Sequence, residues 1–129
     1  MAEEDRIGKV PSRVSKIWLG EDGIIHIVIL PNAELSQADA KANVVAVDQI
    51  SQGKKQPLLV DIRQAKAMDR EVRREFASAT NVTATALLIA SPVSRVIGNF
   101  FIGLNEAAVP VRLFTSEAEA VEWLKGFLE

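Results

Sequence analysis

Apolar residues gather in five short runs along this chain, and between these runs they recur at helical spacing. The apolar runs predict strands at 14–20, 24–30, 58–62, 82–90 and 109–114. The amphipathic segments predict helices at 36–52, 69–79, 92–104 and 116–128. The predicted element order is therefore β-β-α-β-α-β-α-β-α, the order of an α/β domain.

The first two predicted strands are separated by Asp22-Gly23, a strong hairpin signal. The second strand, from Ile24 to Leu30, is apolar at nearly every position, so we expect both of its faces to be buried inside a sheet. Right-handed crossovers then make four strands parallel, with the first hairpin strand antiparallel at one edge. The expected architecture is a mixed five-stranded sheet.

Helix starts are marked by serine residues. Ser36 stands three positions before Asp39, and Ser116 stands three before Glu119 in a capping-box pattern. Ser91 precedes a proline, which is favoured at the first position of a helix. The helix that follows Ser91 has the cleanest apolar stripe, which we expect to lie flat on the core: Val93, Val96, Ile97, Phe100, Phe101 and Leu104.

Length and composition indicate one domain, at 14–129, after a flexible lead-in at 1–13. Seventeen acidic against fifteen basic residues give no electrostatic footprint for nucleic acid. The chain has no cysteine and one histidine, which exclude disulfides, thiolate metal sites and clusters of imidazole ligands; we expect no cofactor. No apolar run reaches the length of a membrane span, and the acidic start does not resemble a secretory signal, so we expect a cytoplasmic protein.

Candidate chemistry belongs at the carboxyl ends of the parallel strands. The first candidate is a mixed-charge loop that could dock a partner or bind a polar ligand: Asp61, Arg63, Lys66, Asp69 and Arg70. The alternative is structural, with Asp61 and Arg63 paired to hold the loop. The second candidate is an anion site at Ser91, Ser94 and Arg95, where a helix start favours negative charge. Its alternative is a plain N-cap at Ser91 with a solvated Arg95.

His26, the only histidine, lies inside an apolar strand and is interpreted as a structural residue. Trp18 and His26 are candidates for an interface. We identify no catalytic residues, because no nucleophile with a base, metal cluster or cofactor motif is recognisable. The sequence therefore predicts a protein that is not an enzyme.

The strand LLVDI, the loop into a helix at Asp69 and the closing LFTSEAEAVEWL resemble the SpoIIAA-like fold of STAS domains and, more loosely, of SEC14-like proteins. The chain looks most similar to uncharacterised bacterial members. In the anti-sigma-factor antagonists among STAS domains, a phosphorylated serine follows an aspartate at this helix start. Asp61 and Asp69 match the two acids of that pattern, whereas Arg70 stands where the serine should be. The resemblance thus implies a regulatory or scaffolding module without this phosphorylation switch.

A second hypothesis from the resemblance is a SEC14-like carrier of a small apolar or anionic ligand. The apolar stripe would then face a pocket lined by Leu88, Ile97, Phe100 and Phe101. For assembly, strands that follow one another in space place most helices on one face, although several strands are apolar on both. We therefore expect a homodimer through the bare face or the edge hairpin, near Trp18 and His26. The alternative is that some helices cross to the second face.

Overall fold

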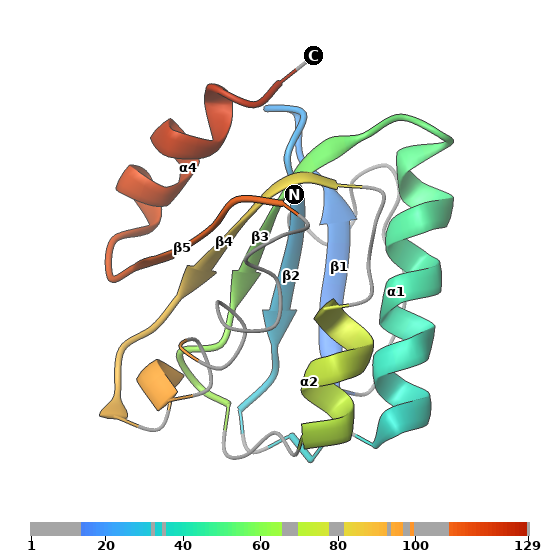
Figure 1. Cartoon of the computed structure of the whole chain (residues 1–129), viewed down its shortest axis with the longest axis vertical. Coiled ribbons are helices and arrows are strands. Elements are labelled where there is room, and N and C mark those ends of the chain that lie inside the picture. The colour runs from blue at the N-terminus through green and yellow to red at the C-terminus, as the bar shows by residue number, and fades with distance from the viewer. Residues whose placement is uncertain are drawn as a thin grey trace.

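A five-stranded sheet with helices against both of its faces forms the domain in the computed structural model (Figure 1). The structure describes residues 14–31, 33–34, 36–65, 70–77, 82–92, 94–96, 99 and 109–128. The strands are β1 (Ser15–Leu19), β2 (Ile25–Ile29), β3 (Gln56–Asp61), β4 (Val82–Leu88) and β5 (Val111–Phe114).

The strands lie in the order β1-β2-β3-β4-β5, each beside its neighbour in the sequence. β1 pairs with β2 in antiparallel fashion, and all other pairs are parallel. The predicted mixed sheet with an antiparallel edge strand is therefore confirmed. β3 begins two residues earlier than predicted, at Gln56, and includes Pro57. The register between β3 and β4 shifts between Gln56 and Leu58, which is where a residue without an N–H fits in a sheet.

The described helices are α1 (Gln37–Ser51), α2 (Arg70–Ala77) and α4 (Glu117–Lys125). Ser36 and Asp39 form a complete capping box at the start of α1. At α4 only one half of the predicted box is present, the bond that the Glu119 N–H donates to the hydroxyl of Ser116. α1 ends at Ser51 and is followed by two left-handed residues, Gln52 with a φ of 52° and Gly53 with a φ of 83°, a conformation that glycine adopts readily.

Of the predicted helix at 92–104, the described residues 92, 94–96 and 99 are helical, and the others lie outside the described residues. The predicted apolar stripe is wrong at Val96, because 63% of the surface of this residue is exposed. Spacing alone placed Val96 on the stripe. The breadth of a helix's buried face depends on what packs against it, and spacing does not report this.

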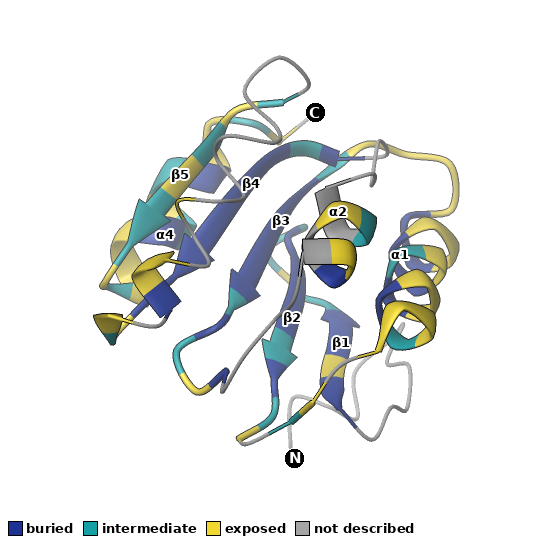
Figure 2. Cartoon of the chain, turned by 60° about the horizontal axis from the view of Figure 1, so that its bottom comes forward, coloured by how far each residue is buried: buried dark blue, intermediate teal, exposed yellow. Residues whose placement is uncertain are grey.

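α1 and α2 lie on one face of the sheet, and α4 lies on the other, mainly against β3, β4 and β5 (Figure 2). Right-handed crossovers between neighbouring parallel strands keep the connecting helices on one face. α4 follows β5 and does not connect two of the described parallel strands, so the crossover rule does not determine its face. The sequence leaves open, as the alternative to a bare second face, that some helices cross to that face. The structure has helices on both faces.

The two faces of β3 show why both sides of the sheet are apolar. Leu58 packs in the cluster with Val47 of α1 and Val72 of α2. Leu59, the next residue, packs in a separate cluster with Leu124 of α4. Successive side chains of a strand point to opposite faces, so a strand covered on both sides needs apolar residues throughout. The expectation that the central strands are buried on both faces is confirmed.

Candidate functional site

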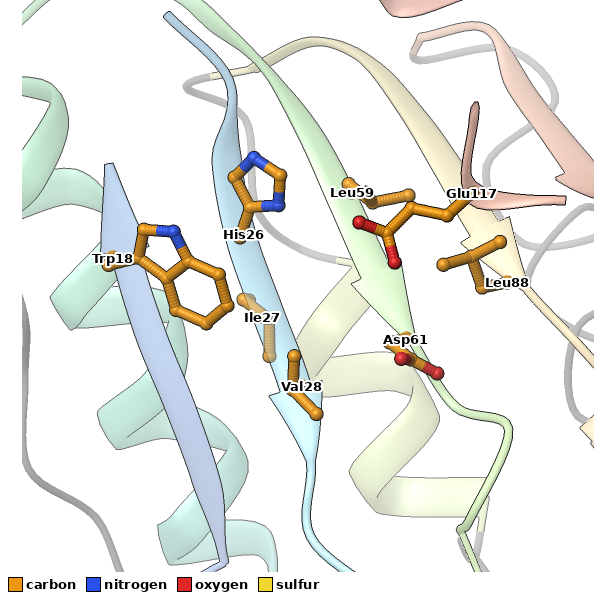
Figure 3. Close-up of a pocket in the computed structure, with 8 residues that line it drawn as sticks. All are labelled: Trp18, His26, Ile27, Val28, Leu59, Asp61, Leu88 and Glu117. Carbon is orange, nitrogen blue, oxygen red and sulfur yellow. The ribbon is translucent and has the colours of Figure 1, made fainter. Parts of the chain in front are cut away.

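A small cavity of about 120 Å³ opens on the α4 side of the sheet, towards the carboxyl end of β3 (Figure 3). It is lined by Trp18, His26, Ile27, Val28, Leu59, Asp61, Leu88 and Glu117. Pockets for drug-sized ligands span roughly 300–1,000 Å³. This cavity therefore has room for a few water molecules or a small chemical group.

Trp18 and His26 form one wall of the cavity. They are directly opposite each other in the β1–β2 ladder, and their rings stack with centroids 5.1 Å apart. Trp18 is 7% exposed and His26 is 9% exposed, so both side chains are buried within the chain. The two predicted interface residues are thus brought together, but their rings offer little surface to a partner.

Asp22 ties His26 to the hairpin turn. One carboxylate oxygen of Asp22 lies 3.4 Å from Nε2 of His26, and the other accepts the Ile24 N–H at 3.0 Å. Gly20 lets these groups approach, because a Cβ at Gly20 would lie 2.5 Å from Oδ1 of Asp22. The Asp-Gly signal correctly placed the turn but did not show that its acid reaches the histidine. That contact arises only once the hairpin closes.

Asp61 and Arg63 form the strongest polar contact of the site. Asp61 accepts Nε of Arg63 at 3.0 Å and Nη2 at 2.7 Å, and it also accepts the backbone N–H of Arg63 at 3.0 Å. The hydrogen bond from Asp61 raises the pKa of Arg63 above its ordinary value; partial burial opposes this, and the charges of Asp61 and Glu117 add to it. The guanidinium therefore stays protonated, and the structural pairing weighed from the sequence is present.

Glu117 extends this pair to a second element. Its Oε1 lies 3.6 Å from Nη2 of Arg63, so an ion pair joins the loop after β3 to the first turn of α4. Side-chain exposure rises from 14% at Asp61 through 37% at Arg63 to 56% at Glu117. The charged cluster thus begins inside the domain and ends at its surface. Sequence reasoning missed Glu117, because nothing local to it indicates a partner in the loop after β3.

The other residues of the predicted docking loop are only partly among the described residues. Lys66 and Asp69 lie outside the described residues. Arg70 is the first residue of α2, and its side chain is also outside the described part. Of the predicted docking loop, the side chains of Asp61 and Arg63 are therefore described, and the structure places Glu117 beside them.

The hydroxyls of the predicted anion site are engaged by the backbone. Ser94 is fully buried, and its Oγ accepts the N–H groups of Ala90 and Ser91, each at 2.9 Å. In return, Oγ of Ser91 accepts the Ser94 N–H at 3.1 Å, as in a capping box. Arg95 is exposed and lines a different cavity, together with Arg112.

Within the part of the chain that the structure describes, no group of three or more His, Asp or Glu side chains is placed to hold a metal ion. The described helices are also too short or too polar to cross a membrane.

Residues 17–128 match the family model described as a domain of unknown function, DUF7793. The chain belongs to this family. No curated protein matches the chain. The DUF7793 chain is similar to a solved protein of Shewanella loihica PV-4 from the DUF3478 family, which has a SpoIIAA-like fold. The two share 12% identity over 89% of this chain and 98% of the other, with a TM-score of 0.61. The domain therefore has a SpoIIAA-like fold, as its sequence resemblance indicated.

A second solved structure, a protein of unknown function from Arthrobacter sp. FB24, is 36% identical to this DUF7793 chain. The match covers 84% of this chain and 96% of the other, with a TM-score of 0.34.

Proposed function

We propose that this DUF7793 domain is a non-catalytic cytoplasmic module that binds a protein partner through the charged surface of Arg63 and Glu117. The observation that carries the proposal is the ion-pair cluster at the carboxyl end of β3, which starts at the part-buried Asp61 and ends at the exposed Glu117. Ligands of α/β sheets bind preferentially at this end of the strands.

The geometry of Arg63 suits recognition. Asp61 holds Nε and Nη2 of the guanidinium, so the side chain is fixed before a partner arrives while more than a third of it stays exposed. Fixing a side chain in advance lowers the entropy lost on binding. The exposed carboxylate of Glu117 adds a negative group beside this positive one. A partner that presents an acidic and a basic group side by side would match this surface.

The buried polar groups nearby support a non-catalytic role. Both hydroxyls of the Ser91–Ser94 pair are bound to the backbone or to each other. Among the described residues, His26 contacts Trp18 and Asp22 and does not contact a serine or threonine hydroxyl. A catalytic base has to reach the proton that it removes. These groups stabilise the fold instead.

The alternative of a ligand carrier is less well supported by the cavity beside Trp18. Its volume of about 120 Å³ is small for a lipid chain. Leu88, which the carrier hypothesis placed in a pocket, is fully buried and packs with Leu124 of α4 while also lining this small cavity. Ile97, Phe100 and Phe101 lie outside the described residues.

Charge reversal at the surface tests the proposal. The tagged protein, Arg63→Glu and Glu117→Lys are expressed in the native host, crosslinked and purified, and the captured proteins are quantified by mass spectrometry. Arg74→Glu is the matched control, because Arg74 is exposed on α2 and lines neither cavity. A partner retained by the wild type and by Arg74→Glu, but lost from both surface variants, is expected.

The captured partner is then purified, and its affinity is measured by calorimetry. Loss of a charge-assisted contact should weaken binding by about tenfold or more. Glu117→Lys keeps the test interpretable if Arg63→Glu does not fold, because the Glu117 side chain is mostly exposed. Equal binding by all variants would contradict this docking surface. Turnover of a substrate by the wild type would contradict the non-catalytic role.

A further inference from the structure

Two arginines from different elements share a second cavity, where β4 and β5 end. This cavity has a volume of about 220 Å³. Its lining is Ile89, Arg95, Arg112, Leu113, Phe114, Thr115 and Glu119, and none of these lines the cavity beside Trp18. The floor is partly apolar and the charged groups come from the helix after β4, from β5 and from α4.

Arg112 is held over an aromatic ring. Its guanidinium carbon lies 5.2 Å from the ring centre of Phe114, two residues further along β5 on the same face of the sheet. This cation–π contact positions the guanidinium without neutralising its charge. Arg112 therefore presents a positive group at the cavity while remaining exposed to solvent.

Arg95 reaches the same cavity from the capped turn after β4. Its backbone N–H donates to the carbonyl of Ser91 at 2.9 Å, in the turn that the buried Ser94 hydroxyl stabilises. Among the described residues, neither Arg95 nor Arg112 forms an ion pair with a carboxylate. Glu119 also lines the cavity, so two positive groups face one negative group.

We propose that this cavity binds an oxyanion, a phosphate or carboxylate group of a ligand, through Arg95 and Arg112. Guanidinium groups offer paired N–H donors that match the geometry of such anions. The two guanidinium groups outnumber the single carboxylate that lines the cavity, and a bound anion would balance the excess positive charge. Thr115 also lines this cavity, and its hydroxyl would serve as a neutral donor. The proposal goes beyond the docking function and shares no residue with it.

Glu119 makes the proposal testable in both directions. Glu119 lines the same cavity as the two arginines, so its negative charge opposes an incoming anion. Removing this charge should therefore tighten anion binding, whereas removing either arginine charge should weaken it. A variant that merely damages the fold does not tighten binding.

The test is an NMR titration of the ¹⁵N-labelled full chain with inorganic phosphate and, separately, with acetate, in a buffer free of other oxyanions. We expect the amide signals of Arg95, Arg112 and Thr115 to shift. Arg95→Gln and Arg112→Gln should each weaken binding by about tenfold, the loss expected for a hydrogen bond to a charged group. Glu119→Gln should bind more tightly, and Arg74→Gln should match the wild type.

If phosphate binds more tightly than acetate, the site is assigned to phosphate groups. If acetate binds equally well or more tightly, the site is assigned to carboxylates. Absence of localised shifts with both anions overturns the proposal. Wild-type affinity in Arg112→Gln also overturns it, as does unchanged affinity in Glu119→Gln.

Discussion

The indole of Trp18 lies parallel to the imidazole of His26, with 5.1 Å between the ring centroids and 5° between the ring planes. The two residues face each other across the antiparallel β1–β2 ladder. Because Asp22 also contacts His26, the contacts of His26 join the edge strand, its neighbour and the turn between them. These contacts support the interpretation of His26 as a structural residue.

The contributions of Trp18 and His26 to stability should be energetically coupled, because their rings stack. Trp18→Leu and His26→Leu should each lower the free energy of unfolding, by about 1–3 kcal/mol, because both side chains are buried. In the double variant the two losses should fall short of their sum by about 0.5–1.5 kcal/mol, the contribution of an aromatic pair. Urea unfolding followed by circular dichroism measures all four proteins. Strictly additive losses would show that the rings are neighbours without a stabilising interaction.

Gly20 should be sensitive to an added methyl group. In Gly20→Ala the new Cβ would displace the Asp22 carboxylate, whose Oδ1 would lie 2.5 Å away, and weaken the bond that Ile24 donates to it. We expect a loss of about 1 kcal/mol, the contribution of one hydrogen bond. Gly126→Ala is the control, because the added Cβ would lie 3.4 Å from the backbone oxygen of Trp123, close to ordinary van der Waals contact. Thermal melts that rank the two variants in the opposite order would refute this account.

Ser94 should contribute more to stability than an ordinary cap. Ser94→Ala leaves two backbone N–H groups, those of Ala90 and Ser91, without the hydroxyl that they share. We expect a loss of about 2–3 kcal/mol, because the site is buried. Ser116→Ala removes a part-exposed cap and should cost about 1 kcal/mol. Denaturant midpoints compare the two variants, and similar losses would mean that the N–H groups of Ala90 and Ser91 find other partners.

The homodimer stays a prediction. β1 is the edge strand of the described sheet, and the hairpin that it forms with β2 is the predicted contact between two copies of the chain. α4 lies mainly on β3, β4 and β5 of the second face, away from this edge. Sedimentation equilibrium at micromolar concentration should give twice the chain mass of 14.1 kDa. A mass of 14.1 kDa throughout the concentration range would rule the dimer out.

The sequence by itself determined the elements and their order. The apolar run at Ile24–Leu30, the turn at Asp22-Gly23 and the cap at Ser36 are local signals, and each is present in the structure at the place it predicted. Local signals suffice here because strand and helix periodicities are set by the neighbouring residues of the same segment. Right-handed crossovers then restrict the sheet to few arrangements, and the parallel order of β2 to β5 follows.

Only the tertiary structure decided which side chains meet. Arg63 contacts Glu117 because the loop after β3 ends beside the first turn of α4, and Arg95 shares a cavity with Arg112 because β4 pairs with β5. The exposure of Val96 likewise could not be predicted from its spacing along the helix. Such contacts depend on strand register and on the face that a helix takes. Both follow from packing the whole chain around two apolar layers, and no short segment carries that information.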